Sequence, residues 1–190
     1  MNNAWKHFKT ITYHKFLVAR GCFRVGLYWQ GIVHDLSKYG LTEFRVGMKY
    51  YQGNRSPNNA EREGIGYSTS WMHHKGRNKH HYEYWIDYSM ENVTGGMIPV
   101  PMPDKYIAEM VMDRIAASKV YEGRNYTDAS SLNYYLQRGG VSLMHEYTGR
   151  RLEEMLTMLA EEGEDVTFRY IRNVFLNKLT HSEKLQNTIQ

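Results

Sequence analysis

The residues with the clearest chemical potential are the adjacent His34 and Asp35, which open the sequence His-Asp-Leu-Ser-Lys ending at Lys38. A neutral imidazole and a carboxylate at consecutive positions can hold a divalent metal ion and leave coordination sites open. Further nitrogen and carboxylate donors occur where helices could bring them back to this pair, namely His14, His73, His74, His80, His81 and Asp113. These residue types predict a metal site.

The segments that must position these donors have helical patterns. Residues 4–21 place His14 on an apolar face, so its side chain is expected to point inward. A second helix over about 22–36 would carry the His-Asp pair in its last turn. A strongly apolar helix over 104–121 carries Asp113, where an unpaired carboxylate would be unfavourable.

The rest of the chain is also predicted to be helical. Glycines 64 and 66 are expected to weaken or break one helix, and the proline-containing segment 94–103 is expected to be a loop. No stretch alternates with a period of two, so the sequence predicts an all-α, single-domain helical bundle over 1–179 and a polar C-terminal tail over 180–190. The other helices are expected over 42–51, 58–75, 80–89, 128–138, 142–162 and 166–179.

Length, composition and charge limit the classes of protein to which this chain can belong. The chain has 190 residues and 42% hydrophobic content, which suits one domain with its own core. It has no apolar run of about 18 to 20 residues and no signal-peptide core, so we expect a cytoplasmic protein without a membrane partner. The net charge of +4 is modest, and the basic residues are scattered apart from the stretch 62–79. This charge distribution favours small phosphate ligands over a long nucleic-acid track.

The order His, His-Asp, two His pairs and Asp resembles the HD superfamily over residues 14–113. Domains of that superfamily are helical and bind one or two metals. The resemblance implies one or two divalent transition metals, drawn from Mn, Fe, Ni, Co or Zn. It further implies that Asp35 bridges two sites, the first completed by His14, His34 and Asp113. In the two-metal branches, histidines between the His-Asp pair and the last Asp complete the second site.

The second site would then draw on the segment 73–81, with His74, His80 and His81 as candidate ligands. The pattern His74-x-x-x-Asn78-x-His80-His81-x-Glu83 is similar to a segment of small phage and bacterial HD-like proteins, which favours His74 over His73. Tandem histidines cannot share a helix face, so one of each pair is expected to ligate. The other would donate a hydrogen bond or contact substrate.

The run from His34 to Lys38 is similar to the family's His-Asp-x-x-Lys form, in which the lysine lies beside the substrate phosphate. A solvated lysine at a helix end would explain Lys38 equally well. Thr10 stands where HD-GYP proteins with three metals have a glutamate, and the Gly-Tyr-Pro signature is missing. Hydrolysis of cyclic-di-GMP is therefore not predicted.

The resemblance implies a metal-dependent phosphohydrolase that acts on a nucleotide or other small phosphate ester. Asp35 and Lys38 would be catalytic, and Lys38, Arg77 and Lys79 would hold the substrate phosphate. Two alternatives remain open. One is an HD-like di-iron oxygenase, related to the inositol oxygenases. The other is a non-catalytic HD-like ligand-sensing or interaction module with a tyrosine-rich surface.

Overall fold

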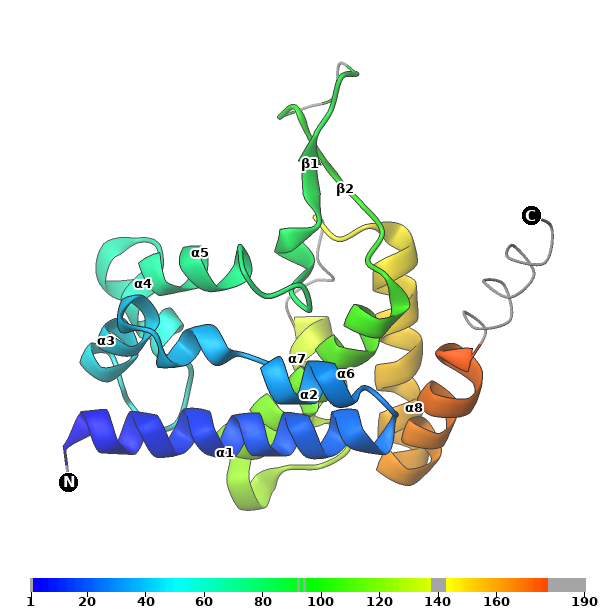
Figure 1. Ribbon diagram of the computed structural model, residues 1–190, viewed down its shortest axis with the longest axis horizontal. Coiled ribbons are helices and arrows are strands. Elements are labelled where there is room, and N and C mark those ends of the chain that lie inside the picture. The colour runs from blue at the N-terminus through cyan, green and yellow to red at the C-terminus, as the bar shows by residue number, and fades with distance from the viewer. Residues whose placement is uncertain (1, 92, 94, 138–142, 178–190) are drawn as a thin grey trace.

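The fold is all-α apart from one small hairpin, as the sequence predicted. The computed structural model describes residues 2–91, 93, 95–137 and 143–177. Figure 1 shows the principal helices, which are α1 (Asn3–Arg24), α2 (Tyr28–Val33), α3 (Leu41–Lys49), α4 (Pro57–Ile65), α5 (Thr69–Lys75), α6 (Asp104–Glu122), α7 (Ser130–Gln137) and α8 (Glu146–Tyr170). The shorter elements are helical turns at Leu36–Tyr39, Tyr82–Tyr84, Gly123–Asn125 and Ile171–Phe175, and the strands β1 (Ile86–Tyr88) and β2 (Met97–Pro99).

The hydrophobic core is built around α6, which packs against both α1 and α8. Every residue of α6 from Ile107 to Met112 is buried, as expected for a central helix. Helix α1 approaches α6 closely at Gly21, where an added Cβ would lie 2.7 Å from the Sδ atom of Met112. This packing brings His14 of α1 to Asp113 of α6.

Helix α1 confirms the face that the sequence predicted, because His7, Ile11, His14 and Val18 are all buried. The predicted helix over 22–36, however, is wrong. Its first turn belongs to α1, and the chain then turns at Gly26, whose φ of 86° suits glycine. Only the six residues of α2 remain helical.

The periodicity of this second helix also predicts a buried side made of Val25, Tyr28, Trp29, Ile32 and Val33. Val25 is buried, but the middle of that side is exposed. Tyr28, Trp29 and Ile32 expose 57%, 70% and 54% of their surface. Gly31 is the buried residue of this short helix instead, and an added Cβ there would lie 2.9 Å from the ring of Phe23. The tight packing of a glycine against Phe23 therefore turns the aromatic side chains of α2 outward.

The predicted helix over 58–75 breaks at Gly66, whose φ is 86°. The break gives α4 and α5, with Ser68 capping α5 by accepting a hydrogen bond from the backbone N–H of Trp71. The spacing of Asn58 and Glu61 also predicts a capping box, which the Glu61 carboxylate does not form. It accepts hydrogen bonds from the hydroxyls of Ser68 and Thr69, both at 2.6 Å, and so holds α5 against α4.

The predicted helix over 80–89 is also wrong. After one helical turn at Tyr82–Tyr84 the chain forms β1, which pairs antiparallel with β2 through Asp87 and Ile98. Strand β2 lies within the segment that was predicted to be a loop. The hairpin projects from the helical body in Figure 1.

The structure has one long helix, α8, where the sequence predicted two helices over 142–162 and 166–179. Helix α8 runs through the predicted boundary and bends at Gly163, whose φ is 79°. The predicted cap at Ser142, the predicted stop at residues 139 and 140, and the polar tail over 180–190 lie outside the described residues. Within the described ranges, every helix is too short or too polar to cross a membrane.

The buried His7 imidazole should make the protein less stable in acid. Burial, and then the charge of Lys38, lower the pKa of His7 from 6.5 to about 4. The unfolded chain therefore binds this proton first, so the free energy of unfolding falls as the pH drops from about 6.5 to about 4, by up to roughly 3 kcal/mol. Denaturant titrations at about pH 7 and about pH 4.5 should show a larger loss for the wild type than for His7→Leu. An equal loss in both proteins would contradict this assignment.

Candidate metal centre

Two groups of metal-binding side chains lie side by side and share Asp35. We call His14, His34, Asp35 and Asp113 the first donor cluster, and Asp35, His74, His80 and His81 the second donor cluster. Within each cluster the nitrogen and oxygen atoms lie within 4.8 Å of one another. The structure thus brings together all the donors that the sequence indicated except His73.

Asp35 occupies the centre because of an unusual backbone conformation. Among the described residues it is the one non-glycine with a positive φ, at 55°. Such a conformation costs about 1 kcal/mol and is concentrated at functional sites. The ammonium of Lys15 supports the turn by donating hydrogen bonds to the carbonyl oxygens of Ile32, at 2.6 Å, and His34, at 2.8 Å. The turn lets both adjacent side chains face the same centre.

The first donor cluster is formed by α1, by the turn after α2, and by α6. The Nε2 atom of His14 lies 3.0 Å from Asp113 Oδ1 and 3.5 Å from Asp35 Oδ2. The Nε2 atom of His34 lies 3.4 Å and 3.3 Å from the same two oxygens. Two ligands at about 2.1 Å from one ion lie about 3.0 to 3.4 Å apart, so these separations suit a common ion.

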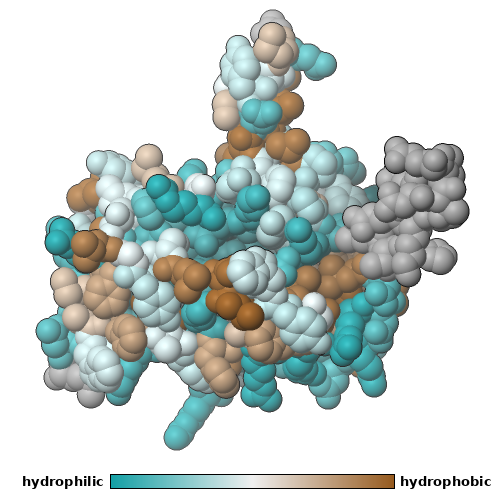
Figure 2. All heavy atoms as spheres, viewed as in Figure 1, coloured by the Kyte–Doolittle hydropathy of each residue, from teal (hydrophilic) through white to brown (hydrophobic). Residues whose placement is uncertain are grey.

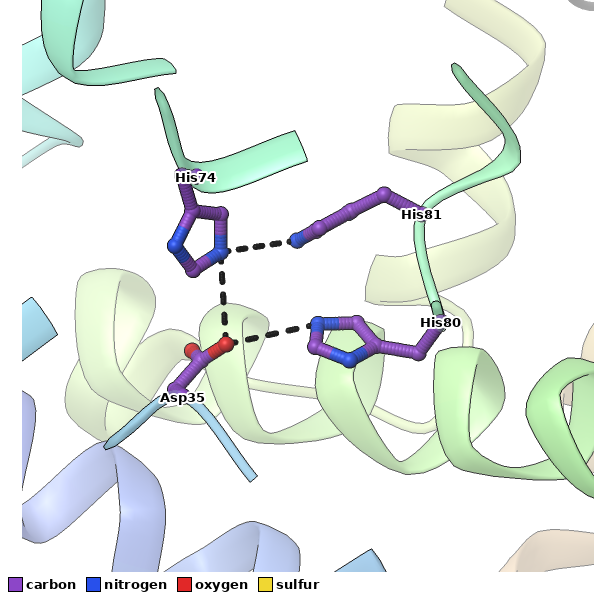
Figure 3. Close-up of side chains that lie close together, drawn as sticks. All are labelled: Asp35, His74, His80 and His81. Carbon is purple, nitrogen blue, oxygen red and sulfur yellow. Dashed lines mark hydrogen bonds and ion pairs between the residues drawn. The ribbon is translucent and has the colours of Figure 1, made fainter. Parts of the chain in front are cut away.

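The second donor cluster uses the other oxygen of Asp35. The Nε2 atoms of His74 and His80 lie 3.2 Å and 3.4 Å from Asp35 Oδ1, and His81 Nε2 lies 2.9 Å from His74 Nε2 (Figure 3). Each carboxylate oxygen of Asp35 therefore faces a different cluster, which is the geometry of a bridging ligand.

Several of these converging atoms lack hydrogen bonds. His14 Nε2, His34 Nε2, His80 Nε2 and Asp35 Oδ1 are buried without a hydrogen-bond partner among the described residues. Buried polar atoms are nearly always paired, and an orphaned group is costly. A cation in each cluster would give all four atoms a partner, so the residues present fit a metal.

Two glutamates behind the histidines orient them. Glu109 Oε1 lies 2.8 Å from His34 Nδ1 and 3.1 Å from His80 Nδ1. Glu43 Oε2 lies 2.7 Å from His74 Nδ1. A carboxylate acceptor keeps the proton on Nδ1 and leaves the Nε2 lone pair facing the centre, as is usual for metal-binding histidines. All three imidazoles thus turn their Nε2 atom toward the centre, where a metal could take the place of a proton.

Our sequence analysis missed both glutamates. Glu109 lies one helical turn before Asp113, and this spacing of four residues places the two carboxylates on the same face of α6. That signal could have identified Glu109. Glu43 was interpreted only as an acid in the first turn of a helix, and no spacing links it to His74.

The structure also distinguishes the tandem histidines. His74 belongs to the second donor cluster, whereas His73 lies outside both clusters and its Nδ1 lies 2.7 Å from Glu43 Oε1. His80 and His81 both place an Nε2 atom in the second cluster. Two neighbours can do so because this segment is not the helix that the sequence predicted.

The electrostatics of the clusters keep the carboxyls ionised. Burial alone would raise the pKa of Asp35, but His34, Lys38 and His74 hold it well below its usual range. Burial likewise opposes ionisation of Asp113, yet the neighbouring imidazoles of His14 and His34 hold its pKa well below the usual range. These are the ionisation states that a metal requires.

The histidines of the two clusters differ in charge. Burial opposes a charge on His34 and His74, but the neighbouring Asp35 raises the pKa of both. His80 and His81 behave in the opposite way. Burial, and then the neighbouring His34, lower the pKa of His80. Burial, and then His80, hold the pKa of His81 well below its usual range. Both imidazoles therefore offer a free lone pair.

The three residues that were predicted to contact the substrate phosphate have different surroundings. Lys38 Nζ lies 2.5 Å from Asp35 Oδ2, and its side chain is 26% exposed. Burial would lower the pKa of Lys38, but Asp35 and Asp113 raise it, so the ammonium stays charged. The exposed Arg77 donates to the carbonyl oxygen of His73, and the Lys79 ammonium lies over the rings of Tyr84 and Tyr106. In the described part of the chain, neither Arg77 nor Lys79 forms an ion pair with a cluster residue.

Comparison with known proteins identifies a family. No curated protein and no solved structure matches the chain. A family described as a family of unknown function, DUF5662, matches residues 3–158, a span that contains both donor clusters and both orienting glutamates. The chain belongs to the DUF5662 family.

Proposed function

We propose that the protein is a metal-dependent phosphohydrolase of the HD type, acting on a nucleotide or other small phosphate ester. The observation that carries the proposal is the pair of donor clusters that share Asp35 and contain orphaned, buried donor atoms. The order of the ligands along the chain supports the likeness to the HD superfamily.

In this proposal His14, His34 and Asp113 would hold one ion, His74, His80 and His81 would hold another, and Asp35 would contribute to both sites. When bound, such ions lower the pKa of a coordinated water and polarise a phosphoryl oxygen. Glu109 and Glu43 fix the imidazole tautomers. The chain thus supplies a rigid and largely dry ligand set.

Lys38 would bind the substrate phosphate. Its charged, partly exposed ammonium lies beside Asp35, so it can pair with a phosphoryl oxygen next to the clusters. Arg77 and Lys79 lie on the exposed turn between His74 and His80. To bind a substrate they would have to leave the carbonyl and aromatic contacts described above.

The test is reconstitution of the metal-free protein with each of Mn, Fe, Co, Ni and Zn, followed by elemental analysis. Release of inorganic phosphate is then measured from a panel of nucleotides and phosphomonoesters. We expect metal-dependent turnover that a chelator abolishes. In Lys38→Met, turnover should fall roughly 100-fold, because one cationic contact to the developing charge is lost.

The metal content of Lys38→Met is the control, and it should match that of the wild type. Loss of metal from this variant would mean that Lys38 holds the metal ligands in place and does not contact the substrate. If iron-loaded protein consumes oxygen and releases no phosphate, the di-iron oxygenase replaces the phosphohydrolase. If no ion binds to the wild type, the proposal fails and a non-catalytic module replaces it.

A further inference from the structure

Helix α1 has a second ordered face, opposite the one that carries His14. Its outward residues follow steps of three and four and combine aromatic and basic types, in the order Trp5, Lys9, Tyr13, Phe16, Arg20 and Phe23. The four aromatic side chains expose 50%, 54%, 59% and 42% of their surface. Over these residues the stripe is about 27 Å long.

The charge of α1 is entirely positive. It contains Lys6, Lys9, Lys15, Arg20 and Arg24 and no aspartate or glutamate. Arg24 pairs with Glu164 and Asp165, and Lys15 is bonded to backbone carbonyls. In the part of the chain that the structure describes, no acidic side chain forms an ion pair with Lys6, Lys9 or Arg20.

The stripe continues onto α2. The rings of Phe23 and Tyr28 are 5.6 Å apart, and Trp29 is 70% exposed. We call the stripe, together with the exposed side chains of Tyr28, Trp29 and Ile32, the α1–α2 face. Figure 2 shows hydrophobic residues gathered over the region that these two helices occupy in Figure 1. Exposed apolar side chains that gather in this way mark an interaction surface.

We propose that the α1–α2 face binds the surface of an anionic phospholipid membrane. Aromatic rings and basic side chains on one helical face are the combination that sits at the lipid headgroup boundary. Positive charge without acidic residues selects anionic lipids. The face is the outer side of one straight helix, which suits a flat surface better than the groove that a single-stranded nucleic acid occupies.

The charge pattern also argues against a second copy of the chain as the partner. Two copies joined through this face would bring Lys9 and Arg20 of each against like charges, with no acidic residue of α1 to offset them. Binding at the surface needs no membrane-spanning helix. We expected no membrane partner because the sequence has no spanning segment and no signal-peptide core. That argument does not address a helix that lies on a membrane surface.

The test is co-sedimentation of the full chain with two kinds of vesicle, one of phosphatidylcholine alone and one that also contains phosphatidylglycerol. The wild type should bind the anionic vesicles, and added salt should weaken the binding. Two double variants test the face, Trp5→Ala/Phe16→Ala and Lys9→Glu/Arg20→Glu. The affinity of each for the anionic vesicles should fall by at least roughly 10-fold. Circular dichroism should confirm that both stay helical, since all four side chains are on the outward face.

The control is Tyr67→Ala/Arg124→Glu, which removes one exposed aromatic and one exposed basic side chain that do not belong to the α1–α2 face and should bind as the wild type does. Lack of binding to anionic vesicles would overturn the proposal, as would equal binding to both kinds of vesicle. A dimer that Phe16→Ala dissociates would assign the face to self-association. Tight binding of a single-stranded oligonucleotide that Lys9→Glu/Arg20→Glu abolishes would assign it to nucleic acid.

Discussion

Asp35→Asn should abolish metal binding at both donor clusters and leave the helical fold intact. The substitution removes the one charge that both clusters share, whereas asparagine keeps the size of the side chain and tolerates a positive φ such as the 55° found here. The metal content after loading, measured by elemental analysis, should fall from about two ions per chain to well below one, because asparagine offers a single neutral oxygen where aspartate offers two oxygens that share a negative charge. Circular dichroism would establish that the variant is folded.

The control for this result is Asp113→Asn, because Asp113 belongs only to the first donor cluster. This variant should lose one ion and keep the other. Asp35→Ala should bind no more metal than Asp35→Asn and should also be less stable, by about 1 kcal/mol, because alanine is strained in the left-handed region. If Asp35→Asn retains both ions, the two clusters do not depend on a shared carboxylate.

Glu109→Ala should weaken metal binding at both clusters, whereas Glu43→Ala should weaken it only at the second. Glu109 orients His34 of the first cluster and His80 of the second, while Glu43 orients only His74 among the cluster residues. Loss of such an orienting carboxylate typically lowers metal affinity about 10- to 100-fold. Competition titrations with a chromophoric chelator would give the two dissociation constants.

The variants of Glu43 and Glu109 can be compared directly because the two side chains are equally buried, each being only 4% exposed. The titration of Asp113→Asn would show which of the two constants belongs to the second cluster. Glu109→Gln should recover part of the affinity, since its amide oxygen can still accept hydrogen bonds from the imidazoles. Unchanged constants in Glu109→Ala would mean that the packing of α6 alone orients His34 and His80.

The helices and most of the ligand candidates could be predicted because they depend on local patterns. The 3.6-residue period placed His14 on the buried face of α1, and the break at Gly66 followed from the conformational freedom of glycine. The donor types at His34, Asp35 and Asp113 indicated a common site before any contact was known. The structure brings these residues together, which the local patterns alone did not require.

The elements that were mispredicted depend on contacts between distant segments. The segment 80–89 forms a strand because Asp87 pairs with Ile98, a partner beyond the reach of any local pattern. The aromatic residues of α2 face outward because Gly31 packs against Phe23. Glu43 reaches His74 only after α3 and α5 have packed together, so its role could not be read from spacing.

The donor atoms come from segments as far apart as His14 and Asp113, and under the proposed metal binding this separation would tie the lifetime of the protein to its metal supply. A ligand that binds only the folded chain stabilises it by mass action. The proposed ions would be held by α1, the turn after α2, the end of α5 and α6. They would therefore cross-link segments that span most of the chain. In a cell starved of metal these segments would open more often and be exposed to proteases. The abundance of the protein would then report metal availability as well as its rate of synthesis.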